Sequence, residues 1–446
     1  MFTITIITVF PELFENWCKT SLIARAQEAG QLKINCIRLA DHVAPKQRID
    51  TPACGPGAGM VLKAPVVAAA IEEAFARYGS GEVVFFTPSG TLLTQRLCQE
   101  MATTYFSEPL SGAPGVGDHH IILVCGRYEG VDDRVIQRYS GRKISIGNYV
   151  LMGGDLPAQV FLEAILRYLP GVVGDSRSVF HDSFSGPLVD FPAYGQPNEW
   201  EGMAVPPVLL SGDHAKIEKW RNDAALTQTV KEHFSWLRTS EISSEMRRSV
   251  AEKIPAHYVV LMHDQVLIGR KEALPGTTSV TTIDVHDIAR SSATYGIKKF
   301  YVVTPLHDQQ ELLRVFFQFW HTDQGRNYNE NRYDAMSCVK VVSSLAEAEA
   351  DIMSLSGQIP LKIATSARPV DGVQSLAFDD QAIAWQTARP VALMFGTGQG
   401  MTAELLQACD YVLTPIHGFT GYNHLSVRAA VAIILDRWLG YFEPSK

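Results

Sequence analysis

Short runs of apolar and β-branched residues recur along the whole sequence and are separated by segments of helix length. In the first half these runs are 4–9, 83–87, 121–125 and 143–146. In the second half they are 258–262, 300–304, 361–365, 391–395 and 411–413. Strands that alternate with helices favour parallel sheets covered by helices. Because 446 residues exceed one ordinary domain, we predict an α/β fold with two such domains.

The stretch between these two domains differs from them in composition and in hydrophobic pattern. Residues 180–207 are rich in Pro, Gly and aromatic residues and show no period, whereas residues 214–248 are charged and helical in pattern, with Asp213 as a candidate N-cap. We therefore predict a small helical domain between the two α/β domains. The predicted parts are 1–168 (first α/β domain), 169–190 (a loop), 191–250 (the helical domain) and 256–446 (second α/β domain).

Composition and charge exclude several classes of protein. Hydrophobic residues make up 46% of the chain, enough for real cores, and no run approaches the roughly 18 apolar residues of a membrane helix. Seven scattered Cys without a CxxC pair predict reduced thiols in a cytoplasmic protein and no metal site. A net charge of −8 excludes a basic, nonspecific nucleic-acid binder, although a local basic face can still bind RNA.

Glycine clusters follow several of the predicted strands, at residues 87–90, 126–130, 147–154 and 396–400. Such loops let the backbone approach a ligand at the carboxyl edge of a parallel sheet. Neither a GxGxxG loop after a first strand nor a GxxxxGK[ST] loop occurs, which favours an adenosine compound without a phosphate chain. The rival interpretation is a nicotinamide oxidoreductase using residues 396–400, but the acidic residue expected about 20 positions beyond is missing.

Three charged residues near these loops are candidates for chemistry. Asp182 lies in the irregular loop, either as a solvated or capping carboxylate or as a general base delivered by that loop. Arg167 ends a predicted helix, where it either stabilises the helix dipole or stabilises an oxyanion. Glu129 stands beside two glycines, either at the surface or against a sulfonium cation.

Residues 1 to about 240 resemble the bacterial tRNA (guanine-N1)-methyltransferase family, in the segments 121–132, 145–158, 170–174, 182–184 and 201–212. The family uses S-adenosylmethionine (SAM) and belongs to the SPOUT class. The resemblance implies a trefoil knot, a homodimer with active sites at the subunit interface, and methyl transfer to N1 of guanosine 37 of tRNA, next to the anticodon. It also implies a requirement for Mg²⁺, for which the sequence shows no site.

The resemblance also implies roles for individual residues. Asp182 would remove the N1 proton, Arg167 would stabilise negative charge on O6 of the base, and basic residues (Arg167, Arg177, Lys216, Lys219 and Arg221) would gather around the tRNA. Two departures from the family are the altered loop at residues 52–60 and Asp155 in place of Glu. The expected SAM-binding residues are Thr87, Pro88, Ser89, Gly90, Gly126, Tyr128, Glu129, Gly130, Ile146, Gly147, Asn148, Tyr149, Val150, Leu151, Gly153, Gly154 and Pro157.

Residues from about 256 resemble a second SPOUT domain, in the segments 282–290, 392–402, 414–418 and 422–431. The resemblance implies a second SAM-dependent RNA methyltransferase, with a ribose 2′-OH as the candidate acceptor. The segment 392–402 lacks the Glu of that branch and is one residue shorter, so a non-catalytic module for dimerisation or RNA binding is the alternative. The candidate residues are Arg290, Gly396, Gly398, Gly400, Ile416, Asn423 and Leu425.

Overall fold

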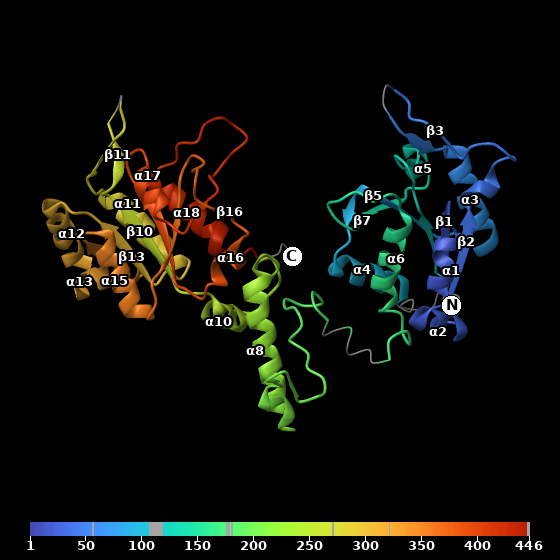
Figure 1. The fold of residues 1–446 in the computed structure, drawn as a ribbon, viewed down its shortest axis with the longest axis horizontal. Coiled ribbons are helices and arrows are strands. Elements are labelled where there is room, and N and C mark those ends of the chain that lie inside the picture. The colour runs from blue at the N-terminus through green and yellow to red at the C-terminus, as the bar shows by residue number, and fades with distance from the viewer. Residues whose placement is uncertain are drawn as a thin grey trace. The chain divides into compact units, whose positions relative to one another are not determined.

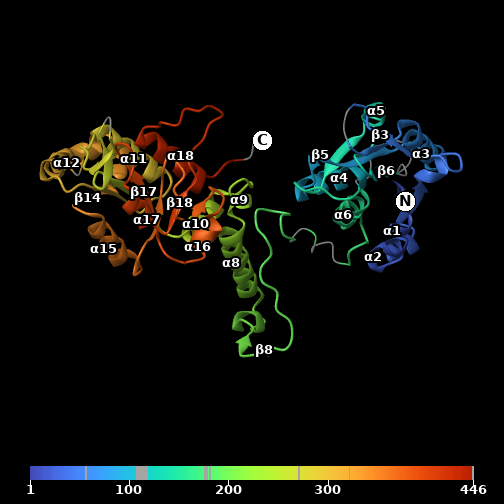
Figure 2. The ribbon, with the colours of Figure 1, turned by 45° about the horizontal axis from the view of Figure 1, so that its top comes forward.

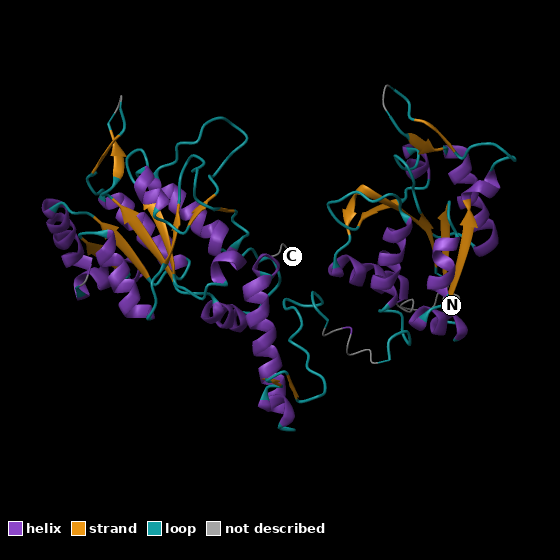
Figure 3. Cartoon of the chain, in the orientation of Figure 1, coloured by secondary structure: helices purple, strands orange, loops and turns teal. Residues whose placement is uncertain are grey.

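A computed structural model describes residues 1–55, 58–106, 119–174, 179, 182–269, 272–320 and 322–443. The chain divides into two compact units, Met1–Gly186 and Pro187–Lys446, which we call unit 1 and unit 2. In each unit, strands form a sheet with helices packed beside it (Figures 1 and 3). The predicted α/β class with parallel sheets is confirmed.

Unit 1 contains a five-stranded parallel sheet in the order β2-β1-β6-β5-β7. Side chains alternate between its two faces: Ile121 and Leu123 of β6 belong to one buried cluster, and Ile122 and Val124 to the other. The sheet is therefore covered on both faces, as all-parallel sheets usually are. Its strands are β1 (Phe2–Thr8), β2 (Leu32–Arg38), β5 (Glu82–Leu92), β6 (His120–Val124) and β7 (Arg142–Ser145).

The helices of unit 1 divide between these two faces. Helices α1, α2, α4 and α6 contribute to one buried cluster, and α3 and α5 contribute to the other. The described helices are α1 (Glu12–Cys18), α2 (Ser21–Glu28), α3 (Ala64–Tyr78), α4 (Gln95–Phe106), α5 (Asp133–Arg138) and α6 (Asp155–Leu166), with a 3₁₀ turn η1 (Leu39–His42). A small antiparallel pair, β3 (Asp50–Pro52) and β4 (Met60–Leu62), flanks the altered loop.

Unit 2 contains a seven-stranded parallel sheet in the order β14-β13-β10-β17-β15-β18-β16. Val259 and Leu261 of β10 pack into one buried cluster, and Val260 and Met262 into the other. The strands are β10 (His257–Met262), β13 (Lys299–Val303), β14 (Val339–Val342), β15 (Leu361–Ala364), β16 (Ser375–Leu376), β17 (Val391–Gly396) and β18 (Tyr411–Leu413).

Most helices of unit 2 cover the face that carries Val259, while α15 and α17 cover the other. The helices after β10 are α11 (Thr282–Thr294), α12 (His307–Trp320), α13 (Asp323–Tyr328), α14 (Glu330–Ser337), α15 (Leu345–Ser356), α16 (Gln381–Trp385), α17 (Ala403–Gln407) and α18 (Val427–Leu439). Two short antiparallel pairs complete the unit: β8 (Glu199–Trp200) with β9 (Met203–Ala204), and β11 (Val266–Ile268) with β12 (Leu274–Gly276).

The charged segment after residue 206 forms the 3₁₀ turn η2 (Pro207–Leu210) and helices α8 (His214–Glu232), α9 (Phe234–Leu237) and α10 (Ser244–Lys253). Asp213 caps α8 as predicted, because its Oδ1 accepts a hydrogen bond from the main-chain N–H of Lys216 at 3.2 Å. Leu226, Phe234 and Val250 join the same buried cluster as β10. The three helices therefore share a core with the rest of unit 2, and α8 projects beyond it (Figure 2).

Within the described part of the chain, no helix combines the length and the apolar composition needed to cross a membrane.

Candidate active sites

A cavity of about 410 Å³ opens in unit 1 beside the carboxyl ends of β6 and β7 and the point where the pairing of β5 is interrupted. It is lined by every predicted SAM-binding residue except Gly90 and Asn148. The carboxyl ends of parallel strands meet at one edge of a sheet, which explains how three separate glycine loops come together. The loops also touch each other directly: the main-chain N–H of Gly154 donates to the oxygen of Gly126 at 2.8 Å.

Residues 87–90 form an excursion inside β5. Phe86 and Thr91 both pair with Ile144 of β7, so the four residues between them bulge out of the ladder. Gly90 lies against β7, because a Cβ placed there would lie 2.6 Å from the main-chain nitrogen of Ile144. The glycine at this position is thus explained by the close approach of two strands and not by the cavity.

Glu129 lines the cavity and connects it to the altered loop. Its main-chain N–H donates to the oxygen of Met60 at 2.9 Å. Gly59 has a φ of +111°, and a Cβ there would lie 2.4 Å from Cγ of Glu129. The described part of the altered loop therefore approaches the cavity wall closely enough that only glycine fits beneath the glutamate side chain.

Arg167 and Asp182 form an ion pair between Nη2 and Oδ2. Arg167 is the C-cap of α6, and Asp182 follows in the loop, with side chains 47% and 26% exposed. The main-chain N–H of Ser185 donates to the oxygen of Asp182 at 3.1 Å. The two predicted catalytic residues thus meet each other, although neither lines the 410 Å³ cavity.

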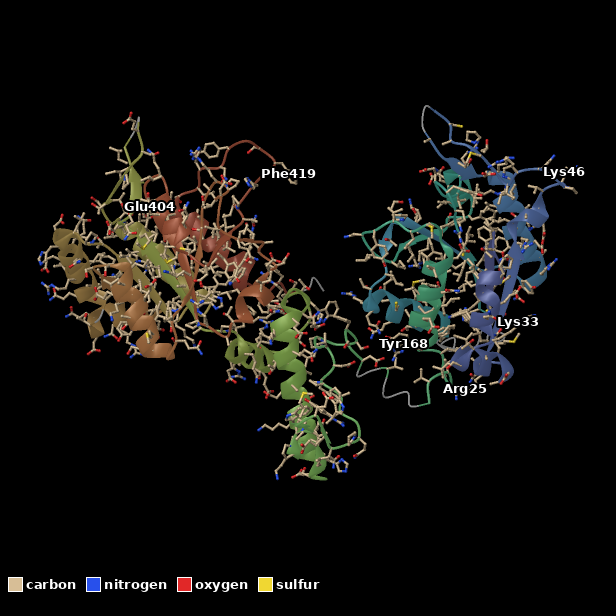
Figure 4. All side chains as sticks on the ribbon, viewed as in Figure 1. Arg25, Lys33, Lys46, Tyr168, Glu404 and Phe419 are labelled. Carbon is tan, nitrogen blue, oxygen red and sulfur yellow. The ribbon has the colours of Figure 1, made fainter. Side chains whose placement is uncertain are left out.

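The segment around this ion pair is tied to α4. The side chain of Gln95 donates to the hydroxyl of Tyr168 at 2.6 Å and to Oγ of Ser185 at 3.5 Å. Tyr168, labelled in Figure 4, directly follows Arg167. One helix therefore holds both the residue after Arg167 and the loop after Asp182.

A larger cavity, of about 950 Å³, lies in unit 2. Among its lining residues are the predicted Gly396, Gly398, Gly400, Ile416, Asn423 and Leu425. Arg290 does not line it and is exposed on α11. Asp284 of the same helix lines it instead and forms an ion pair with Arg428 at 2.9 Å. The segment before α18 carries Asn423 and Leu425, and its exposed Phe419 extends outward (Figure 4).

Sequence reasoning missed His263, which directly follows β10, is 1% exposed and lines this cavity. Its Nδ1 lies 3.0 Å from Oγ1 of Thr278, which lies 2.6 Å from Oγ1 of Thr397. Burial lowers the pKa of His263 to about 4, so the ring is neutral at pH 7. Its position at the carboxyl end of a predicted strand was the only signal in the sequence.

No group of three His, Cys, Asp or Glu side chains converges on a candidate metal position within the described ranges. The seven cysteines are free thiols.

Comparisons with known proteins assign each half of the chain to a family model. Residues 2–238 match the family described as tRNA (Guanine-1)-methyltransferase TrmD, and residues 256–440 match one described as SAM-dependent RNA methyltransferase.

Relatives named tRNA (guanine-N(1)-)-methyltransferase share either both halves or one. A protein of Nitratidesulfovibrio vulgaris is 35% identical over 445 residues, covering 98% of this chain and 99% of that protein. One from Oleidesulfovibrio alaskensis is 36% identical over 441 residues, covering 98% of each. A third, from Moorella thermoacetica, is 36% identical over 252 residues, covering 56% of this chain and 95% of that protein.

Proposed function

Because this chain belongs to the tRNA (guanine-1)-methyltransferase TrmD family, we propose that unit 1 methylates N1 of guanosine 37 in tRNA, next to the anticodon. The observation that carries this proposal is the direct ion pair between Arg167 and Asp182. A carboxylate and a guanidinium held side by side match N1 and O6, the two groups on one edge of guanine that the reaction must address.

The chemistry follows from the structure of guanine. N1 carries a proton and is a poor nucleophile until that proton is removed, and the negative charge that then develops is shared with O6. Asp182 accepts the N1 proton, and Arg167 donates a hydrogen bond to O6. The partially exposed ion pair of the free protein is then exchanged for contacts with the base.

The cavity beside the three glycine loops fits the cofactor of this reaction. Exposed main-chain groups of the loops would hold the adenosine part of SAM, and the Glu129 carboxylate would attract its positive charge. Bound there, SAM supplies a methyl group activated on a sulfonium. The residues described do not form a Mg²⁺ site, and no step of this mechanism passes through Mg²⁺.

An exposed apolar surface beside this cavity supports a homodimer. Val150 and Met152 are 82% and 89% exposed, and Leu13, Leu156 and Val160 lie close to half exposed. Large exposed apolar surfaces commonly mark interaction sites. We propose that a second copy of the chain covers this surface, as the family resemblance implies together with a trefoil knot in each unit. The free thiols fit a reducing cytoplasm.

Helix α8 supplies basic side chains for binding tRNA. Lys216, Lys219 and Arg221 are exposed on it, while Arg177 lies outside the described residues. Cations on a projecting helix bind the phosphate backbone without reading sequence. We propose that α8 docks the tRNA whose guanosine 37 enters unit 1.

Unit 2 is proposed to be a second SAM-dependent RNA methyltransferase, with a ribose 2′-OH as the acceptor. Its support is the family match of residues 256–440 and the cavity that gathers six of the seven candidate residues. A non-catalytic RNA-binding or dimerisation module is the alternative, and it predicts no methyl transfer that depends on this cavity.

The experiment that tests unit 1 is methyl transfer from labelled SAM to unmodified tRNA transcripts that carry G or A at position 37, followed by nucleoside analysis. We expect labelled 1-methylguanosine with G37 and none with A37. Equal amounts of labelled 1-methylguanosine from both transcripts, or none from either, would contradict the proposal.

A further inference from the structure

His263 belongs to a chain of hydrogen bonds that fixes which ring nitrogen carries the proton. The hydroxyl of Thr397 donates to the main-chain oxygen of Met262 at 2.9 Å, because a carbonyl oxygen can only accept. With its hydrogen used, Thr397 accepts from Thr278, and Thr278 in turn accepts from Nδ1–H of His263. Nε2 of His263 is therefore the unprotonated nitrogen.

This Nε2 is a buried acceptor without a hydrogen-bond partner among the residues that the structure describes. Buried polar atoms are normally paired, and a donor that enters the cavity lined by His263 would complete this one. The cavity has room for one: at about 950 Å³ it exceeds the 410 Å³ cavity of unit 1 more than twofold. A methyl donor and a nucleotide can therefore occupy it together.

We propose that Nε2 of His263 accepts the proton of the RNA ribose hydroxyl that unit 2 methylates, an inference that rests on the function proposed for unit 2. The hydroxyl oxygen forms a bond to the methyl carbon, and the carbon–sulfur bond breaks with its electron pair staying on sulfur. The hydroxyl proton passes to Nε2 and afterwards to solvent. Asp284, which lines the same cavity, stabilises the imidazolium during this step.

Two substitutions separate the roles of the two ring nitrogens. His263→Asn keeps a polar group near the Nδ1 position, where it can still contact Thr278, but places nothing at Nε2. His263→Gln reaches the Nε2 position with an amide oxygen that accepts a hydrogen bond and cannot take the proton. Both are made in the full chain with Asp182→Asn, which silences the reaction proposed for unit 1.

The assay uses labelled SAM and total RNA from cells that lack the gene for this chain. Alkaline digestion then reports the acceptor, since a methylated 2′-OH prevents cleavage of the neighbouring phosphodiester and leaves labelled dinucleotides. We expect such dinucleotides with His263 present and about a 100-fold lower rate with His263→Asn. His263→Gln should keep the apparent affinity for RNA and lose the rate, while both variants keep the affinity for SAM.

The outcomes distinguish the two proposals. Absence of alkali-resistant label with His263 intact overturns the function proposed for unit 2. Label that forms at an unchanged rate in His263→Asn overturns the role of His263 while that function stands. A weakened affinity for SAM in His263→Asn assigns the Nε2 contact to the ribose of SAM and also overturns the proposal.

Discussion

Nη2 of Arg127 lies 2.7 Å from Oδ2 of Asp155, and this ion pair joins the glycine loop after β6 to the first residue of α6. Asp155 is 2% exposed and also accepts a hydrogen bond from the hydroxyl of Thr8 at the end of β1. Its place at a helix N-terminus further stabilises the negative charge. One buried carboxylate thus connects two of the segments that line the cavity of unit 1.

Removing this charge should destabilise unit 1. Asp155→Asn leaves the guanidinium of Arg127 without its counter-ion, and breaking a buried pair costs about 3–5 kcal/mol. In chemical denaturation we expect the free energy of unfolding to fall by about 3 kcal/mol. This is the lower end of the range, because the side chain of Arg127 is 20% exposed. Glu100→Gln, which breaks the exposed pair with Arg96, is the matched control and should cost under about 1 kcal/mol. Equal losses for the two variants would contradict this account.

Asp182→Asn should slow methyl transfer to G37 tRNA strongly and leave the affinity for SAM unchanged. An amide cannot take the N1 proton, so we expect single-turnover methylation of G37 tRNA to slow by about 10²–10⁴-fold. Because Asp182 does not line the cavity of unit 1, SAM affinity should stay the same in a titration. Asp41→Asn, an exposed carboxylate in η1, serves as control. A loss of SAM affinity matching the loss of rate would show that Asp182 acts in binding.

The stability of unit 2 should fall in mild acid. Nδ1–H of His257 donates to the oxygen of Pro255, and its Nε2 accepts from the indole of Trp438 at 3.0 Å. Burial lowers the pKa of His257 in the folded protein to about 4. Below pH 6.5 the unfolded chain therefore binds a proton that the folded protein does not bind. The contribution of neutral His257 to the stability of unit 2 is fully present above pH 6.5 and is lost as the pH falls toward 4.

The measurement is the free energy of unfolding between pH 7.5 and 4, with His257→Asn for comparison. The histidine contributes about 3 kcal/mol to the loss in this window. The variant will be less stable at pH 7.5 but should show a shallower decline toward acid. Parallel curves for the two proteins would exclude His257 as a source of the pH dependence.

Arg238 should stabilise the packing of α8–α10 against the rest of unit 2. The buried guanidinium donates to the main-chain oxygens of Asp436, Arg437 and Gly440, around the C-terminal end of α18. Arg238→Ala removes all three hydrogen bonds, and we expect a loss of about 3 kcal/mol with faster amide exchange in α8. Arg247→Ala, which removes an exposed ion pair with Glu443 and a cation–π contact with Tyr441 but no hydrogen bond to α18, should leave exchange in α8 unchanged. Equal exchange in both variants would contradict this role.

The sequence predicted every central strand of the two large sheets, but of their four edge strands it predicted β7 and missed β2, β14 and β16. Buried β1 and β6 consist mainly of apolar and β-branched residues, whereas β2 alternates polar residues such as Lys33 and Asn35 and was not predicted. At the sites, the residues that motif resemblance selected line the two cavities, apart from Gly90, Asn148 and Arg290. The hydrogen bonds that orient the ring of His263 join segments far apart in sequence, and no local pattern reveals them.

The central claim is that each unit holds its own SAM site, and equilibrium titration of the full chain with labelled SAM tests it most directly. Leu151→Arg and Leu425→Arg each place a cation in one cavity at an exposed position, and Leu355→Arg on α15 is the matched control. We predict two SAM per chain in the unmodified protein and in the control, one in each cavity variant, and none in the double variant. One SAM per chain, abolished by Leu151→Arg and unaffected by Leu425→Arg, would contradict the account of unit 2.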